Sequence, residues 1–250
     1  MMQKKRLGQV FLKDKNILRI IAENAEIQDG EIILEIGPGP GNLTKELLSR
    51  GAKVISIEKS KEYYDLLSTI LNDEIEKGKL KVINADALKI DFPKFDKIVS
   101  NIPYNISSPL TFKLLNYDFK MGIIMYQKEF AKRLVAKPGN KDYSRLSVNM
   151  YYFADAEIIR NVPRSCFNPV PDVDSALVKI LPRKKFSVKS EKAFFDIVKE
   201  LFSQRRKKIR NILKMHNIPF EDRRPEELTP EEFGILSDFL YENKYFDRKE

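Results

Sequence analysis

The residues with the clearest chemical potential form one short segment, Asn101-Ile102-Pro103-Tyr104-Asn105, which directly follows an apolar run. The side-chain oxygen of Asn101 and a backbone carbonyl of Ile102 or Pro103 can each accept one N–H of an exocyclic amine. Tyr104 can stack on the base that carries the amine. Such alignment turns the nitrogen lone pair toward a methyl donor by proximity, without a metal or a strong base. Because Asn and Pro are also common in ordinary turns, the segment alone does not establish this chemistry.

A glycine-rich segment indicates where a nucleoside cofactor binds. Gly37-Pro38-Gly39-Pro40-Gly41 lies between an apolar run and a helical pattern. Glycine suits a backbone that turns tightly and lets a ligand approach closely. Glu58 lies 21 residues after Gly37, where an acid hydrogen-bonds ribose hydroxyls in more than one cofactor class.

Three further positions favour S-adenosylmethionine over a nicotinamide cofactor. The nicotinamide pattern G-x-G-x-x-G/A is not met, because residue 42 is Asn. Glu35 lies in a buried strand and needs hydrogen-bond partners there, which indicates an acceptor that orders the loop. Asp86, within Ala85-Asp86-Ala87-Leu88, follows the third strand and can accept from the amino group of an adenine. We therefore expect a donor site that includes Glu35, Gly37, Gly39, Glu58, Asp86 and Ala87.

The elements around these motifs alternate between strand and helix, which predicts an α/β, Rossmann-like methyltransferase sheet. Strands are expected over 32–36, 54–58, 80–84, 96–101, 121–126, 157–162 and 176–181, with helices over 15–25, 43–50 (capped by Asn42), 60–75, 107–115, 128–135 and 146–153. Beyond residues 182–187 only helical patterns occur, over 191–202, 205–215 and 231–241. We expect a methyltransferase domain over 1–184 and a small, all-helical, RNA-binding domain over 185–250.

The composition excludes several other kinds of site. Cys166 and His216 are the only residues of their types, so neither an internal disulfide nor a His/Cys zinc site can form, and we expect no metal. A Ser-His-Asp triad would need His216, which lies in a basic helical stretch. No apolar run approaches the roughly 18 residues that span a bilayer, and the basic N-terminus is not followed by a secretory apolar segment. We expect a cytoplasmic monomer that does not contact membranes.

The formal net charge of +9 is unevenly distributed. Residues 183–216 hold 12 Lys and Arg against 3 acidic residues, and residues 1–19 hold 6 against 1, whereas residues 217–250 are acidic. A charge run can be only a solvated face. Two basic segments that flank a larger domain favour nucleic acid as the partner. We expect phosphate contacts along the predicted basic helix, from Arg205, Arg206, Lys207, Lys208 and Arg210.

Six motifs, taken together and in this order, resemble a known family. They are Leu7-Gly8-Gln9-Val10-Phe11-Leu12, Glu35-Ile36-Gly37-Pro38-Gly39-Pro40-Gly41, Asn101-Ile102-Pro103-Tyr104-Asn105-Ile106-Ser107, Arg145-Leu146-Ser147-Val148, Phe167-x-Pro169-x-Pro171-x-Val173-x-Ser175-Ala176 and Gln204-Arg205-Arg206-Lys207. The chain is similar over about residues 4–213 to the dimethyladenosine transferases of small-subunit ribosomal RNA, the KsgA family.

This resemblance implies methyl transfer from S-adenosylmethionine to N6 of two adjacent adenosines near the 3′ end of small-subunit ribosomal RNA, within a precursor of that subunit. It implies that Gln9, Val10 and Leu12 close over the donor, with only a backbone contact at Val10, where the family usually has Asn or His. It also implies that Gly37 and Gly39 approach the methionine part, that Glu58 holds the ribose, and that Asp86 binds the adenine.

For the target base, the resemblance implies that Asn101, Pro103 and Tyr104 hold the amine and that Phe167 stacks opposite Tyr104. Packing in the core is the alternative for Phe167. Erm-type enzymes of large-subunit RNA share the catalytic motif, but the segment 204–207 and the Pro-rich loop after Phe167 favour the small-subunit enzyme. A non-enzymatic assembly or transcription factor on the same fold would have no need of an intact donor loop.

Overall fold

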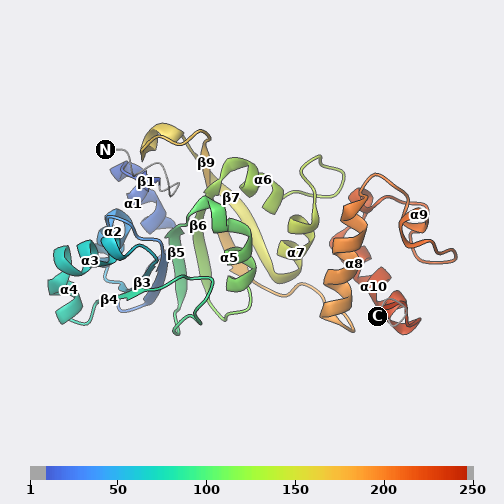
Figure 1. Ribbon diagram of the computed structural model, residues 1–250, viewed down its shortest axis with the longest axis horizontal. Coiled ribbons are helices and arrows are strands. Elements are labelled where there is room, and N and C mark those ends of the chain that lie inside the picture. Colours follow the sequence, from blue (N-terminus) through green and yellow to red (C-terminus); the bar gives the residue numbers. More distant parts are fainter. Residues whose placement is uncertain (1–9, 247–250) are drawn as a thin grey trace. The chain divides into compact units, whose positions relative to one another are not determined.

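The structure is a computed structural model that describes residues 10–246 (Figure 1). The chain forms two compact units. The first extends to Ala131 and resumes over Glu157–Pro182, and the second comprises Lys132–Ala156 and the chain from Arg183 onward. No helix within the described residues is long and apolar enough to cross a membrane.

The first unit is built on a seven-stranded sheet with the order β4-β3-β2-β5-β6-β9-β7. Its strands are β2 (Ile32–Ile36), β3 (Lys53–Glu58), β4 (Leu80–Asn84), β5 (Lys97–Asn101), β6 (Met121–Gln127), β7 (Ala154–Val162) and β9 (Ser175–Pro182). The pairs from β4 to β6 are parallel and β9 is antiparallel to β6. Strand order reverses between β2 and β5, and ligands of such sheets bind outside the carboxyl ends of the strands at this point. The predicted α/β class is confirmed.

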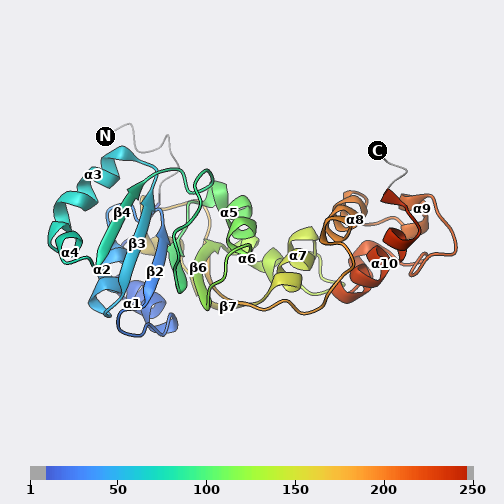
Figure 2. The same ribbon diagram turned by 90° about the horizontal axis from the view of Figure 1, so that it is seen from below.

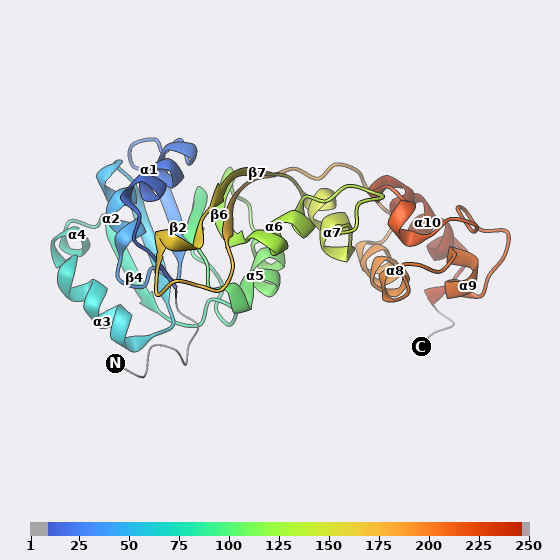
Figure 3. The ribbon, with the colours of Figure 1, turned by 90° about the horizontal axis from the view of Figure 1, so that it is seen from above.

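Helices cover both faces of this sheet, so its central strands are buried on both sides and consist of apolar runs. The helices of the first unit are α1 (Lys15–Asn24), α2 (Asn42–Ser49), α3 (Lys61–Ile70), α4 (Asn72–Glu76), α5 (Ser107–Leu114) and α6 (Lys128–Leu134), the last of which continues into the second unit. Figures 2 and 3 show α1 on one side of the sheet and α5 on the other. Ile33 and Val99, on adjacent strands, have no exposed surface.

Two local predictions in this region are wrong. Gly41, not Asn42, is the N-cap residue of α2, and no side chain among the described residues caps this helix. The φ of Gly41 is 82°, in the left-handed region that favours glycine. The side chain of Asn42 instead donates a hydrogen bond to the backbone oxygen of Leu12 (2.8 Å). The helix predicted over 60–75 is interrupted at Leu71, which separates α3 from α4.

A two-stranded sheet joins the start of the described chain to a loop ahead of β9. Its strands, β1 (Phe11–Leu12) and β8 (Phe167–Asn168), are antiparallel, and Leu12 is paired with Phe167. The backbone N–H of Lys13 extends the connection by donating to the oxygen of Cys166 (2.9 Å). The pairing holds the first described residues beside the carboxyl ends of β2 and β5.

The second unit is helical, with α7 (Arg145–Phe153), α8 (Glu191–Ser203), α9 (Ile209–Leu213) and α10 (Pro230–Glu242). Figure 1 shows α8 and α10 side by side. The chain enters this unit for the second time at Arg183, close to the domain boundary that the sequence predicts after residue 184. Residues 132–156, which fall within the domain predicted over 1–184, cluster with the second unit, and Val148 and Tyr152 are buried in its core.

Candidate active site

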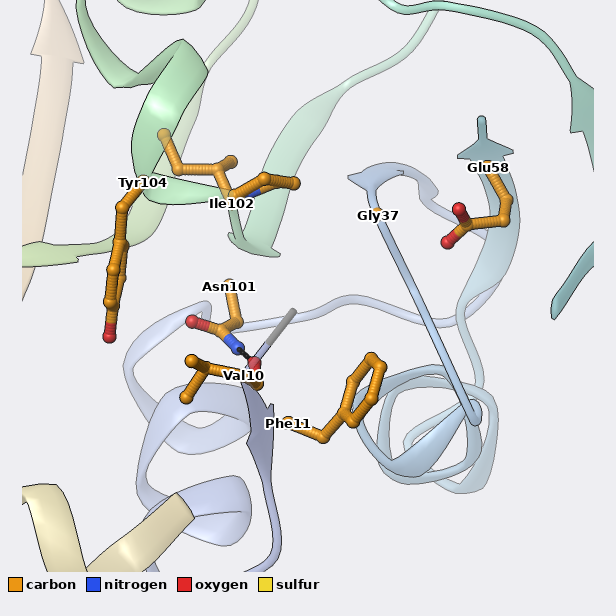
Figure 4. A pocket seen from close by; sticks show the side chains of 8 residues that line it. Val10, Phe11, Gly37, Glu58, Asn101, Ile102 and Tyr104 are labelled. Atoms are coloured by element: carbon orange, nitrogen blue, oxygen red, sulfur yellow. Dashed lines mark hydrogen bonds between the residues drawn. The ribbon is translucent and has the colours of Figure 1, made fainter. Parts of the chain in front are cut away.

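Three adjoining pockets lie at the carboxyl ends of the central strands, and Gly37 lines all of them. The largest has a volume of about 330 Å³ and is bounded by residues that follow β2, β3, β4 and β5. The other two have volumes of about 50 and 20 Å³ and are lined by Phe11 and Asn101. Figure 4 shows the pocket of about 50 Å³, with Glu58 near Gly37 and with Asn101 beside Val10, its side-chain oxygen on the side of Tyr104.

The glycine-rich loop is held in a conformation that side chains rarely adopt, with φ of 70° at Gly37 and 54° at Gly39. A Cβ on Gly39 would lie 2.4 Å from Cε1 of Phe11, and one on Gly37 would lie 3.1 Å from Cδ of Pro103. Backbone conformation favours glycine at both positions, and the close approach of Phe11 adds a steric reason at Gly39, whereas a Cβ on Gly37 would only crowd Pro103.

Glu58 ends β3 and binds two backbone N–H groups, one in the glycine-rich loop and one at the start of α3. Its Oε2 accepts from the N–H of Gly39 (3.1 Å) and its Oε1 accepts from the N–H of Ser60 (2.7 Å). The side chain is 5% exposed and lines two of the pockets. A carboxylate has about four acceptor positions, so each oxygen retains capacity for one more donor, as a ribose diol requires.

Asp86 lines the largest pocket together with Ala87. Its Oδ1 accepts from the N–H of Leu88 (3.0 Å) and its Oδ2 pairs with Nζ of Lys59 (2.9 Å). The hydrogen bond from Lys59 is the main cause that lowers the pKa of Asp86, which is therefore an ionised acceptor at neutral pH. From α5, Nζ of Lys113 donates to the backbone oxygens of Ala87 (2.9 Å) and Ile90, and holds this loop in place.

Glu35 is the most deeply buried acid of the site, at 1% exposure. One of its oxygens, Oε2, accepts from Oγ1 of Thr44 (2.7 Å) and from Oγ of Ser56 (3.0 Å). Burial is the main cause that raises the pKa of Glu35 to about 7, while these two hydrogen bonds act in the opposite direction. Glu35 also lines the smallest pocket, beside Asn42 and Asn101.

Asn101, the last residue of β5, presents an amide whose two ends differ in their surroundings. Its Nδ2 donates to the backbone oxygen of Val10 (3.4 Å). Its Oδ1 is buried and has no hydrogen-bond partner within residues 10–246, and it is turned toward Tyr104 in Figure 4. A buried oxygen without a partner is costly in folded proteins, so it indicates a site for a donor that residues 10–246 do not supply.

Tyr104 follows Asn101 on a single 3₁₀ turn, Tyr104–Ile106, and lines the same pocket. Its Oη lies 2.6 Å from Oγ of Ser175, at the start of β9, and either hydroxyl can donate. Burial is the main cause that raises the pKa of Tyr104, so the phenol remains protonated at neutral pH. The ring is partly exposed, with Pro103 exposed ahead of it.

The comparisons with known proteins agree with this geometry. A model of the family described as ribosomal RNA adenine dimethylase matches residues 1–224. The chain belongs to that family. It is 48% identical, over 94% of its length and 93% of the relative's, to a probable ribosomal RNA small subunit methyltransferase A from Methanosarcina acetivorans. A protein of the same description from Pyrococcus furiosus is 41% identical over 94% of this chain and 91% of that protein.

Solved structures of similar proteins support the same assignment. A dimethyladenosine transferase from Plasmodium falciparum has a TM-score of 0.82 and 34% identity, over 94% of this chain and 98% of the other. The 23S rRNA methyltransferase ErmE has a TM-score of 0.72 and 27% identity, over 92% and 99% of the two chains. The resemblance to the KsgA family is confirmed, and the chain is an S-adenosylmethionine-dependent methyltransferase.

The predicted donor residues within the described part of the chain line the three pockets, except Gly39, whose N–H is bound by Glu58. Gln9 lies outside the described residues. Leu12 is buried, and its backbone oxygen accepts from Asn42. Val10 contributes a backbone oxygen, which binds Asn101. The free acceptor positions of Glu58 and the ionised carboxylate of Asp86 fit the hydroxyl and amino donors of S-adenosylmethionine.

Phe167 departs from its predicted role. The ring has no exposed surface and belongs to the apolar core of the first unit. Its backbone pairs with Leu12, and its side chain does not line the pocket that contains Tyr104. In this structure Phe167 therefore exposes no face to a base, as its core-packing alternative predicts, and its stacking on the target base stays a prediction.

Some residues of the site were missed by the sequence analysis. Phe11 makes an edge-to-face contact with Tyr63, with ring centroids 5.0 Å apart, and lines the two smaller pockets. The largest pocket also includes apolar and polar side chains to which the sequence assigns no role: Ile36, Ile57, Lys59, Ser60 and Ile106. The signal for Ile36 and Ile57 was available, because each lies at the carboxyl end of a predicted parallel strand.

The basic residues of the second unit fall into two groups. Arg205 is bound to Glu226 (2.9 Å) and to the backbone oxygen of Lys141 (3.0 Å), while Lys208 and Arg210 both pair with Asp222 (2.9 Å each). Arg206 and Lys207 are exposed and form no ion pair among the described residues. The continuous helix predicted over 205–215 is wrong, since residues 204–207 form a turn and α9 begins only at Ile209.

Proposed function

We propose that this protein transfers methyl groups from S-adenosylmethionine to N6 of two adjacent adenosines near the 3′ end of small-subunit ribosomal RNA, giving N6,N6-dimethyladenosine. The observation that carries the proposal is the buried Oδ1 of Asn101, which has no hydrogen-bond partner in the described part of the chain and lies at the edge of the donor pockets. This oxygen needs an N–H donor, and an adenine amine supplies one.

The chemistry then depends on alignment. Oδ1 of Asn101 accepts one N–H of the amine and a backbone oxygen of Ile102 or Pro103 accepts the other, which leaves the nitrogen lone pair directed away from the base plane. Tyr104 stacks on the base, a contact worth roughly 1–3 kcal/mol. When bound, S-adenosylmethionine would supply the electrophilic methyl group: its methyl C–S bond would break as the N–C bond forms, S-adenosylhomocysteine would leave, and the amine proton would pass to solvent. No residue of the turn has to act as a strong base.

For the donor, we propose that Gly37 and Gly39 approach its methionine part, that Glu58 binds the ribose, and that Asp86 accepts from the adenine amine, next to Ala87. Support for Glu58 and Asp86 comes from their positions on the wall of the 330 Å³ pocket and from their remaining acceptor capacity. Glu35, Gln9, Val10 and Leu12 complete the proposed donor-binding set.

For the RNA, we propose that Arg206 and Lys207 contribute the main phosphate contacts of the second unit, because neither is committed to an ion pair among the described residues. Lys208 and Arg210 share a single carboxylate, Asp222, and add to the same positive surface. Arg205 is the weakest candidate, since its guanidinium is bound within the unit. We further propose that the protein acts as a cytoplasmic monomer on a precursor of the small subunit.

The small subunit is favoured over the large one as the source of the RNA. Several relatives at 41–48% identity carry the description of a small subunit methyltransferase A. The Plasmodium falciparum dimethyladenosine transferase also matches this chain with a higher identity and TM-score than ErmE does.

The direct test is incubation with unmethylated small ribosomal subunits and isotopically labelled S-adenosylmethionine, followed by mapping of the modified bases. Dimethylated adenosines at two adjacent positions are expected. Asn101→Ala serves as the control, and it should lose methyl transfer while its affinity for the donor stays near that of the wild type. Labelling of large subunits instead, or full turnover by Asn101→Ala, would refute the proposal.

A further inference from the structure

The hydrogen bond between Tyr104 and Ser175 has no part in the alignment described above. It joins the turn that carries the proposed amine-binding residues to the first residue of β9, with 2.6 Å between the two hydroxyl oxygens. Ser175 has no exposed surface, whereas Tyr104 is partly exposed and lines the pocket that contains Asn101. One end of the bond thus lies in the protein interior and the other at the proposed base-binding site.

Ser175 is held in place from both sides along the backbone. It is paired with Gln127 in the antiparallel β6–β9 ladder, and the next residue, Ala176, is paired with Tyr126. On the other side, the oxygen of Asp174 accepts from the N–H of Lys128 (3.0 Å), and its carboxylate accepts from the N–H of Arg164 (3.0 Å). The Ser175 hydroxyl is therefore a rigid reference point.

Tyr104 has much less support from its own segment. It begins a single 3₁₀ turn of three residues, directly after an exposed proline. The Tyr104 side chain on such a short turn can adopt several rotamers, and fixing one of them costs conformational entropy. A hydrogen bond from the far end of the ring to a rigid hydroxyl removes that freedom before a base arrives.

We propose that Ser175 is a positioning residue for methyl transfer, which holds the Tyr104 ring in the orientation that stacks on the target base. The inference rests on the proposed function, and it adds a residue that makes no contact with the reacting atoms. The orientation of the Tyr104 ring matters more because Phe167 is fully buried in this structure and provides no second face on which the base could stack. Alignment of the base then depends on Tyr104, and misplacement by about 1 Å can cost around 100-fold in rate.

The alternative is that the bond only satisfies the buried hydroxyl of Ser175, and a double-mutant cycle separates the two cases. Tyr104→Phe keeps the ring and removes its hydroxyl, Ser175→Ala removes the partner, and the double variant lacks both. We expect each single variant to lower kcat about tenfold to 100-fold, with unchanged donor affinity. We expect the double variant to be no slower than the slower single variant, because both changes remove the same interaction.

The matched control is Tyr126→Phe, which removes a similar pair, since Oη of Tyr126 lies 2.8 Å from Oγ1 of Thr111 within the same unit. Its kcat should stay near that of the wild type even where its melting temperature falls. The proposal is overturned if Tyr104→Phe turns over at the wild-type rate, if the two single effects multiply in the double variant, or if the control loses as much activity. Should Ser175→Ala not fold, Tyr104→Phe against Tyr126→Phe still tests the inference.

The outcome is separable from failure of the proposed function. If the wild-type protein does not methylate small-subunit RNA, the proposed function is refuted whatever the variants do. If the wild type is active and the cycle shows no coupling, only the role of Ser175 is refuted.

Discussion

The ring of Phe11 lies directly against Gly39, so that a Cβ on Gly39 would be 2.4 Å from its Cε1. Through this contact, the start of the described chain packs against the glycine-rich loop. Because the same glycine gives its N–H to Glu58, a disturbance at Gly39 reaches the proposed ribose acceptor directly.

Gly39→Ala should therefore weaken binding of S-adenosylmethionine. The clash with Phe11 adds about 1–3 kcal/mol to the strain of a left-handed residue, which corresponds to a loss in affinity of tenfold or more. Isothermal titration with the donor measures the effect. Gly78→Ala is the matched control, since its φ of 68° imposes similar strain while nothing lies within 4 Å of the added Cβ. Equal donor affinities for the two variants would contradict the prediction.

Phe167→Ala should reduce stability more than any aromatic change at the turn, because its ring is fully buried in the core. We expect the free energy of unfolding to fall by about 3–5 kcal/mol, measured by denaturant titration. Tyr104→Ala, at a partly exposed position, should cost clearly less stability while it slows methyl transfer. A stable, slow Phe167→Ala variant would show instead that the ring leaves the core to meet the base.

Lys113→Met should lower donor affinity about tenfold without changing affinity for RNA. The ammonium group holds the backbone of Ala87 and Ile90, and this loop carries Asp86 on the wall of the largest pocket. Lys89→Met removes the same charge from an exposed position nearby and should leave the affinity unchanged. If the Lys113 and Lys89 variants have the same donor affinity, the hydrogen bonds from Lys113 to the loop do not contribute to donor binding.

Arg206→Ala combined with Lys207→Ala should weaken RNA binding and reduce the slope of log affinity against log salt by roughly 1 to 2, one phosphate contact for each cation. Arg205→Ala should instead lower the melting temperature and leave the slope unchanged, because Arg205 binds Glu226 and the backbone of Lys141. Filter-binding titrations over a salt series give both slopes. If Arg205→Ala reduced the slope of log affinity against log salt more than the double variant does, Arg205 would be the main phosphate contact instead.

Glu35 should make the protein less stable as pH rises. Burial raises its pKa to about 7 in the folded state, from an ordinary value of 4.5, so the folded state binds more protons than the unfolded state between these values. Stability contributed by this group is present below about pH 4.5 and is lost as pH rises toward 7, by an amount on the order of 3 kcal/mol. Denaturant titrations of wild type and Glu35→Gln across this range should diverge, with the variant relatively more stable at pH 8.

The sheet and its donor loop were predictable because their signals are local. A strand buried on both faces is a continuous apolar run, as at Ile32–Ile36, and the glycines that follow it mark the turn. The pairing of Leu12 with Phe167 was not predictable, since strands of two residues have no periodicity and their partners are distant in the chain. An aromatic residue beside a proline looks the same whether its ring is in the core or in a pocket. The ion pair between Arg205 and Glu226 was likewise not predictable, because a run of basic residues does not show which of them bind acids within the chain.

The allocation of residues 132–156 to the second unit has a consequence for protein engineering. The chain leaves the first unit, contributes α7 to the second, returns for β7 and β9, and leaves again at Arg183. Val148 and Tyr152 of α7 are buried in the core of the second unit. A chimera that exchanged only residues 185–250 between two relatives would therefore join a foreign set of helices to the host's α7. Grafts intended to transfer RNA preference have to carry both segments together.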